Sequence, residues 1–162
     1  MRIEDDIKLD FNDVLIRPKR STLTSRKEVD LVRKFKFKHS GWEYTGVPIM
    51  ASNMDGVGTM EMAEALYDHK LFTCLVKSNS EDQFEDLVGR VGANHFAVST
   101  GTSDADFQRL TRIINSWPEI HFICIDVANG YSEHFGDYVA KVRETFPSCT
   151  IIAGNVVTAD MT

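Results

Sequence analysis

Five short apolar runs recur along the chain from residue 47 onward. They cover residues 47–52, 72–76, 96–99, 122–125 and 150–153. Each run is continuous rather than alternating, which is typical of parallel strands covered on both faces. The expected strands start at Val47, Phe72, His95, His121 and Thr150, in steps of 25, 23, 26 and 29 residues. This spacing predicts five strands joined by four helices.

Amphipathic stretches with recognisable ends lie between the apolar runs. Their expected starts are Ser80, Ser103 and Ser132, and Ser80 with Gln83 has the spacing of a capping box. Pro118 and Pro147 end the last two stretches, since proline cannot continue a helix. A shorter helix is expected around residues 62–66. We expect the apolar stripes of all four helices to face the core.

Strict alternation of strand and helix implies right-handed parallel crossovers, as in an open doubly wound sheet or a (β/α)₈ barrel. The open sheet requires a glycine-rich turn after its first strand. Gly56 and Gly58 are present there, but Glu61 stands where the third glycine should be. A barrel instead places polar residues at the carboxyl ends of its strands. In this chain, polar residues cluster at these predicted ends. We therefore predict an α/β fold: the first five strands and four helices of a (β/α)₈ TIM barrel.

The first 46 residues follow a different pattern. Apolar and charged residues alternate over 35–38 and over 42–44, on either side of Ser40 and Gly41, which predicts an antiparallel hairpin. The expected domains are therefore an N-terminal arm and hairpin over 1–46 and the barrel portion over 47–162. Nine of the 18 Lys and Arg residues lie between positions 17 and 38. This basic segment is either a solvated edge or an arm that meets an anionic ligand or a neighbouring subunit.

Composition narrows the class of protein. Hydrophobic residues make up 43% and charged residues 26%, the balance of a soluble globular domain. The net charge of −6 argues against a nucleic-acid partner. No apolar run approaches the ~20 residues of a membrane span, so no membrane partner is expected. Three cysteines without a close pair argue against disulfides, and we expect a cytoplasmic protein.

Two charged residues stand where apolar runs end. Lys77 follows the second run and Asp126 the fourth. A lone lysine at a strand end is often only solvated, whereas a carboxylate leaving a buried strand must be paired, hydrogen-bonded or functional. The histidines lack metal-binding spacing, so no metal site is predicted. Cys74 and Cys124 lie inside apolar runs and are expected to be inert core thiols, and Cys149 lies in a loop at the opposite end. The residues alone indicate a ligand site at the top of a parallel sheet.

Three stretches resemble the GMP reductase family. They are residues 8–21 continuing to Ser25 and Arg26, residues 52–59, and residues 124–135 followed by 153–158. The similarity covers essentially the whole chain, about half of a typical family member. IMP dehydrogenase shares the barrel but usually carries an inserted domain after the second strand and helix. Here residues 78–94 leave no room for one, so the resemblance favours the reductase.

The resemblance implies a homotetrameric enzyme that converts GMP to IMP and ammonia with NADPH. It assigns NADPH contacts to Lys77 and to Asp126, Val127 and Ala128, and it assigns Ser25 and Arg26 to the cofactor of a neighbouring subunit. In the family a cysteine thiolate attacks C2 of the purine and hydride reduces the adduct. That cysteine, a general-acid threonine, most GMP phosphate contacts and the ligands of a monovalent cation (K⁺) are expected beyond Thr162. No catalytic residue is therefore expected within this chain.

The chain departs from the family pattern near the expected cofactor site. Gly56 stands where a threonine is usual, and Ser78 and Asn79 replace a histidine and an aromatic after Lys77. Alternatives are therefore a non-catalytic barrel fragment, an assembly partner of the same fold, or an IMP dehydrogenase-like nucleotide-binding protein. A sheet of five strands would also have two open edges, which predicts oligomers or aggregation of an isolated fragment.

Overall fold

The computed structural model describes Asp5, Ile7 and residues 9–162. The first resemblance stretch begins at Lys8, which lies outside the described residues. The chain divides into two compact units, Met1–Asp30 and Leu31–Thr162. The hairpin grouped above with the N-terminal arm lies in the second unit, together with the sheet.

The first unit contains two short 3₁₀ turns, η1 (Phe11–Asp13) and η2 (Arg26–Glu28). Asp10 caps η1 and exchanges hydrogen bonds with Asp13 in a capping box, which satisfies backbone N–H groups of the turn. Ser25 caps η2 by accepting a hydrogen bond from the Lys27 backbone N–H. The described residues of this unit are exposed.

The second unit begins with the hairpin. Strands β1 (Arg33–Lys36) and β2 (Glu43–Gly46) pair antiparallel, with Phe35 opposite Tyr44. This is consistent with the alternation read from the sequence. The ion pair between Lys34 and Glu43, 2.6 Å apart, crosses the two strands on their exposed side.

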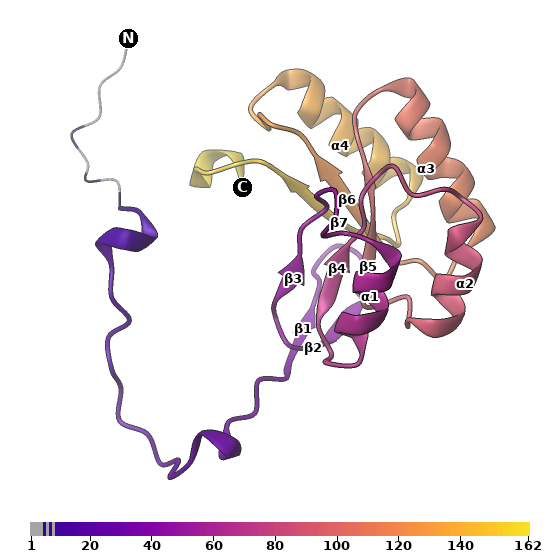
Figure 1. Ribbon diagram of the computed structural model, residues 1–162. Coiled ribbons are helices and arrows are strands. Elements are labelled where there is room, and N and C mark those ends of the chain that lie inside the picture. The colour runs from indigo at the N-terminus through magenta and orange to yellow at the C-terminus, as the bar shows by residue number, and fades with distance from the viewer. Residues whose placement is uncertain (1–4, 6, 8) are drawn as a thin grey trace. The chain divides into compact units, whose positions relative to one another are not determined.

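Five parallel strands follow and form one sheet in chain order (Figure 1). They are β3 (Met50–Ala51), β4 (Phe72–Cys74), β5 (Phe96–Thr100), β6 (Phe122–Asp126) and β7 (Thr150–Gly154). The helices between them are α1 (Met60–Tyr67), α2 (Gln83–Arg90), α3 (Asp104–Ser116) and α4 (Glu133–Thr145). The predicted α/β fold with five parallel strands and four helices is confirmed. None of the helices in the described part of the chain has the length and hydrophobicity that a membrane crossing requires.

Most predicted helix starts are confirmed. The Ser103 and Ser132 side chains accept hydrogen bonds from the backbone N–H groups of Asp106 and Phe135. Ser80 differs. The helix after it begins at Gln83, and its N-cap Asp82 makes no side-chain cap. The Gln83 side chain instead accepts a hydrogen bond from the Ser80 N–H at 3.0 Å, so only half of the predicted capping box forms.

The first strand is much shorter than the predicted 47–52. Only Met50 and Ala51 pair with β4. Pro48 has no N–H to donate, and the Ile49 N–H bonds back to the Val47 carbonyl at 2.8 Å. The chain therefore reaches ladder geometry only at Met50.

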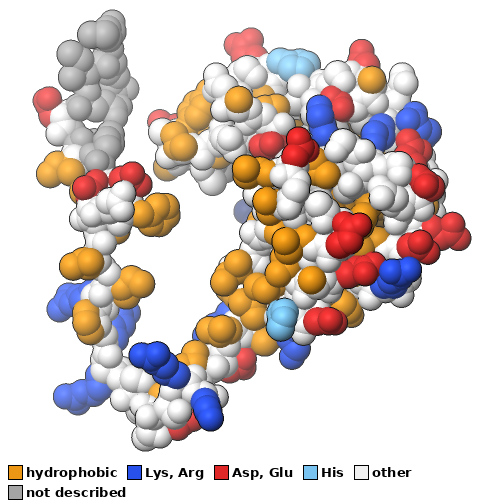
Figure 2. Space-filling model, in the orientation of Figure 1, with side chains coloured by type: hydrophobic (Ala, Val, Ile, Leu, Met, Phe, Trp, Pro, Cys, Tyr) orange, Lys and Arg blue, Asp and Glu red, His pale blue; other side chains and the backbone are white. Residues whose placement is uncertain are grey.

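Two hydrophobic clusters lie on the two faces of the sheet. The larger one packs the four helices against the outer face around Phe96, Leu110 and Ile123. The smaller one lies on the inner face and joins Phe72, Cys74, Phe122 and Cys124 to Tyr44 of the hairpin. Apolar side chains remain exposed on the side of β3 and the hairpin, as Figure 2 shows: Ile49 is 63% and Phe35 43% exposed.

Candidate functional site

A hollow of about 470 Å³ lies where several parallel strands end. It is lined by Asn53, Met54, Asp55, Val76, Lys77, Ser99, Thr100 and Asp126. These residues belong to β5 and β6 or to the segments that follow β3 and β4. The carboxyl ends of parallel strands meet at one edge, which is where α/β proteins bind ligands. The structure thus brings Lys77 and Asp126 together, although 49 residues separate them in sequence.

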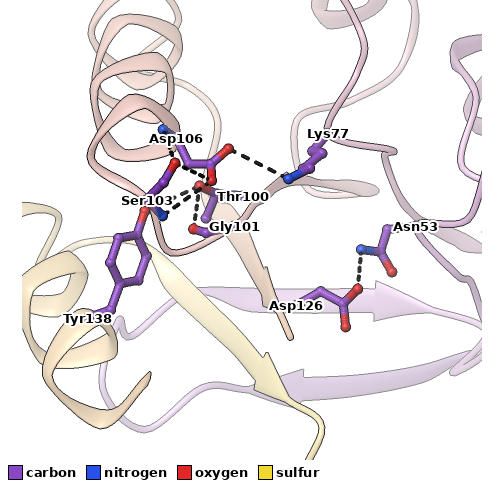
Figure 3. Close-up of polar contacts among 8 residues, drawn as sticks. All are labelled: Asn53, Lys77, Thr100, Gly101, Ser103, Asp106, Asp126 and Tyr138. Carbon is purple, nitrogen blue, oxygen red and sulfur yellow. Dashed lines mark hydrogen bonds and ion pairs between the residues drawn. The ribbon is translucent and has the colours of Figure 1, made fainter. Parts of the chain in front are cut away.

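Lys77 points across the hollow toward the start of α3 (Figure 3). Its Nζ lies 3.8 Å from Oδ1 of Asp106, and the lysine side chain stays 60% exposed. Burial alone would raise the pKa of Asp106, but hydrogen bonds from Ser103 and the positive charges of Lys77 and Arg109 outweigh it and lower that pKa. The carboxylate therefore stays ionised and holds the lysine at the mouth of the hollow. An exposed pair of this kind is weak and leaves the ammonium group available to an anionic ligand.

The strand-to-helix turn before α3 fixes the position of Asp106. The Ser103 hydroxyl donates to Oδ2 of Asp106 at 2.7 Å, and the Asp106 N–H donates back to that hydroxyl at 3.1 Å. A Cβ on Gly101 would lie 2.5 Å from the same carboxylate oxygen, so a larger residue there would displace the Asp106 side chain. Below this turn, the hydroxyls of Thr100 and Tyr138 are hydrogen-bonded at 3.3 Å.

Asp126 extends from the end of β6 into the hollow, opposite Lys77 (Figure 3). The side-chain amide of Asn53 donates to its Oδ2 at 3.1 Å. The amide orients one carboxylate oxygen, and the exposed Asp126 side chain can accept further hydrogen bonds from a ligand.

The other predicted cofactor residues lie elsewhere. Val127 and Ala128 follow Asp126 but do not line this hollow. The backbone N–H of Val127 donates to the Gly154 carbonyl and its own carbonyl accepts from Asn155, so this segment is fixed to the end of β7. Ser25 and Arg26 belong to the N-terminal unit. Their contact with a cofactor stays a prediction.

Asp106, Tyr138 and Tyr131 were not singled out in the sequence. The spacing of Ser103 and Asp106 in a capping box was a signal for the first of them. No sequence signal pointed to Tyr131, because the hydrogen-bond partners of its hydroxyl lie at least 26 residues away in the chain. Its hydroxyl accepts hydrogen bonds from the N–H groups of Val157 and Thr158, both at 2.9 Å. A hydrogen bond with the Thr158 side chain and these two N–H groups lower the pKa of Tyr131 and fix the segment after β7.

The three cysteines are free and buried. The prediction that Cys74 and Cys124 lie in the core is confirmed, and both belong to the inner cluster. Burial raises the pKa of Cys149, whose thiol donates to the Ile120 carbonyl. The described residues contain no group of three or more His, Cys, Asp or Glu side chains arranged to hold a metal ion.

Comparisons with known proteins identify the family of this chain. The family profile described as "IMP dehydrogenase / GMP reductase domain" matches residues 8–162. A GMP reductase of Salmonella typhi is 56% identical over 164 residues, which cover 99% of this chain and 47% of that protein. A GMP reductase of Escherichia coli (strain K12 / DH10B) is 55% identical over the same shares. The chain spans about half the length of the curated relatives it matches.

A solved structure supports the fold. Inosine 5′ monophosphate dehydrogenase from Legionella pneumophila superposes with a TM-score of 0.74 at 23% identity, covering 91% of this chain and 44% of that one. The resemblance read from the motifs is therefore confirmed, and the chain belongs to the IMP dehydrogenase / GMP reductase family.

Proposed function

We propose that the protein containing this chain reduces GMP to IMP and ammonia with NADPH, and that this chain supplies part of the NADPH site. The relatives named GMP reductase, at 55–56% identity, support this activity. The observation that carries the assignment is the common hollow of Lys77 and Asp126. The two positions that the motifs assign to the cofactor come from different strands and converge at one end of the sheet.

The proposal includes a complete barrel in the intact protein. The five strands would be the first five of a (β/α)₈ barrel, whose remaining strands pair with β3 and β7. Among the described residues, each of these two strands has a hydrogen-bonded neighbour on one side only. The exposed Met50 and Ile49 side chains on the β3 side are consistent with further packing there.

The hollow fits part of a nicotinamide dinucleotide. Its volume of about 470 Å³ is in the range of small-molecule sites. Lys77 supplies a cation for a phosphate or a polar ring substituent, and Asp126 accepts hydrogen bonds from hydroxyl or amide groups. Val127 and Ala128 would add backbone contacts at the rim. In a cytoplasmic homo-oligomer, a tetramer by analogy with the family, Ser25 and Arg26 would reach the cofactor of a neighbouring subunit.

NADPH, when bound, supplies the hydride that replaces the exocyclic amine of GMP, which leaves as ammonia. The residues of this chain bind and orient the cofactor. Lys77 and Asp126 hold the ligand at the carboxyl end of the sheet, and Asn53 and Asp106 position these two side chains. Cys74, Cys124 and Cys149 are buried, so none is suited to attack a purine. The reacting cysteine, its acid and the K⁺ ligands are assigned to residues after Thr162.

An IMP dehydrogenase-like function is the main competitor. The connection between β4 and β5 favours the reductase, because α2 is the only helix or strand between them and no inserted domain is present. A non-catalytic role rests on Ser78 and Asn79, where the family pattern is lost. The backbone carbonyl of Asn79 accepts a hydrogen bond from the Arg109 side chain, a contact that any residue at this position could make.

The test is an assay of the intact protein with both substrate pairs. GMP-dependent loss of the NADPH absorbance, with IMP as product, is the expected result. Reduction of NAD⁺ with IMP would identify a dehydrogenase. Absence of both reactions in a folded, oligomer-competent protein would identify a non-catalytic relative and overturn the proposal.

A further inference from the structure

The loop that carries Lys77 is weakly held by its own hydrogen bonds. It covers residues 77–82 of the connection between β4 and α2, and we call it the lysine loop. The backbone N–H groups of Asn79 and Gln83 lie 3.4 and 3.3 Å from the carbonyls they contact, which is long for this type of bond. Asp82, the N-cap of α2, makes no side-chain cap. Contacts from another element are therefore needed to keep Lys77 in one position.

One side of α3 supplies such contacts. Asp106, Arg109 and Arg112 are spaced three residues apart in this helix, which makes them neighbours on its surface. Asp106 pairs with the Lys77 ammonium group at 3.8 Å (Figure 3). The Arg109 guanidinium donates a hydrogen bond to the backbone carbonyl of Asn79. Two successive residues of α3 on this side thus contact the lysine and the backbone two residues after it.

The third residue, Arg112, extends the contact to the end of the lysine loop. Its Nε and Nη2 atoms donate to the Glu81 carboxylate at 2.9–3.3 Å. This two-point geometry fixes direction as well as distance. Arg109 also acts through its charge, because it helps Lys77 to lower the pKa of Asp106. The carboxylate that faces Lys77 therefore stays ionised.

Helix α3 is fixed more firmly than the lysine loop. Ser103 and Asp106 form a capping box at its start. Leu110 and Ile113, both 0% exposed, pack it against the outer face of the sheet. Side chains that extend from a well-packed helix hold their partners more precisely than side chains on a loop.

The contact at position 79 does not depend on the identity of its side chain. The buried Nδ2 atom of Asn79 has no hydrogen-bond partner among the described residues, whereas its backbone carbonyl is bound by Arg109. The residues at positions 78 and 79, where the family pattern is lost, can therefore change without releasing the lysine loop.

We propose that Arg109 is a positioning residue for Lys77: it fixes the lysine loop through the Asn79 carbonyl and thereby sets the affinity of the hollow for NADPH. Arg112 makes a smaller contribution through Glu81, since an exposed ion pair is weak. The inference rests on the proposed function, because it takes the ligand of Lys77 to be NADPH.

The test measures NADPH binding to the intact protein by nicotinamide fluorescence, together with steady-state kinetics. Arg109→Ala should raise the Kd and the KM for NADPH about three- to ten-fold, the scale of one hydrogen bond from a charged group. The effect should be smaller than that of removing Lys77, because the ammonium group is displaced rather than lost. The kcat at saturating NADPH should stay unchanged, as expected for lost binding alone. Arg109→Lys keeps a donor and the charge and should restore most of the affinity.

Arg143→Ala is the matched control. Arg143 is also half-buried and also donates from a helix to backbone carbonyls, those of Pro147 and Cys149, but it lies at the opposite end of the sheet. Its removal should leave the Kd for NADPH unchanged. For Arg112→Ala, the control is Arg90→Ala, which breaks a similarly exposed pair with Glu64.

Hydrogen exchange without ligand tests the lysine loop itself. The amides of residues 78–83 should exchange faster in Arg109→Ala than in wild type or Arg143→Ala. Equal Kd values in wild type and Arg109→Ala would overturn the proposal, as would unchanged exchange of the loop. If Arg109→Ala fails to fold, Arg109→Gln replaces it. Wild type that binds no NADPH would overturn the proposed function, whereas the exchange measurement would still decide whether Arg109 holds the loop.

Discussion

The two ends of the parallel sheet differ in chemistry. At the amino ends of the strands, the hairpin covers the inner face with aromatic groups: Tyr44 packs edge-on against Phe72, and Trp42 stacks on His121 at 3.5 Å between ring centroids. At the carboxyl ends, charged and amide side chains surround an open hollow. The same strands thus end in a packed base on one side and a polar site on the other. Stability and ligand binding should therefore respond to different mutations.

The sharpest test of this separation is a polypeptide limited to these 162 residues. It contains the polar end of the sheet but only buried thiols. We expect no GMP-dependent oxidation of NADPH from it, because all three of its cysteine thiols are buried. The intact protein, assayed in parallel, is the positive control. Turnover by the short polypeptide at an enzyme-like rate would show that the reacting group lies within this chain.

Truncating an aromatic side chain at the amino ends of the strands should lower the stability of the protein without changing the polar site. Phe122 is 1% exposed and lies against the rings of Phe37 and Phe72. Phe122→Ala should destabilise the protein by about 3–5 kcal/mol, because it leaves a cavity among aromatic rings. Denaturant unfolding measures the loss. Phe35→Ala is the control, since Phe35 is 43% exposed and its truncation should cost far less. Equal losses in the two variants would contradict the packed-base interpretation.

Removal of the Lys77 ammonium group at the polar end should weaken cofactor binding and leave stability nearly unchanged. Lys77→Ala should raise the KM for NADPH roughly 10- to 100-fold, the scale of one charge-assisted hydrogen bond. The unfolding free energy should change by less than about 0.5 kcal/mol, since the ion pair with Asp106 is exposed. Lys34→Ala removes a similarly exposed lysine from an ion pair of the hairpin and should leave the KM unchanged. A Lys77 variant with wild-type KM would remove this residue from the cofactor site.

The smallest expected effect is a pH dependence of stability that comes from two histidines at the amino ends of the strands. Burial lowers the pKa of both His95 and His121 below 6.5. The unfolded chain therefore binds protons at a higher pH than the folded one, so their stabilisation is present above pH 6.5 and declines as the pH falls below it. Thermal unfolding between about pH 5 and pH 8 should show this decline. In His121→Gln the decline should be smaller, and an unchanged profile would exclude His121 as a source.

Much of the fold followed from local pattern. Continuous apolar runs gave the strand positions, and Ser103 and Ser132 marked two helix starts because an N-cap is decided by neighbouring residues. The prediction was less accurate where a single residue changed the hydrogen bonding. Pro48 shortened β3, and α2 begins at Gln83 rather than directly after Ser80.

The site was predicted only in part. Lys77 and Asp126 stood out as charges at the ends of apolar runs, and the family motifs assigned them a common ligand. Asp106, Asn53 and Tyr131 did not stand out, because their partners are 26 to 73 residues away or depend on the angle of a turn.

The sequence by itself determined the order of strands and helices, the polar character of the strand ends and the family. These properties depend on the periodicity of side chains and on short motifs, which neighbouring residues encode. The tertiary structure decided which strand ends share a hollow and which carboxylate holds Lys77. These contacts depend on the register and curvature of a sheet whose strands are 20 or more residues apart, and no local pattern specifies them.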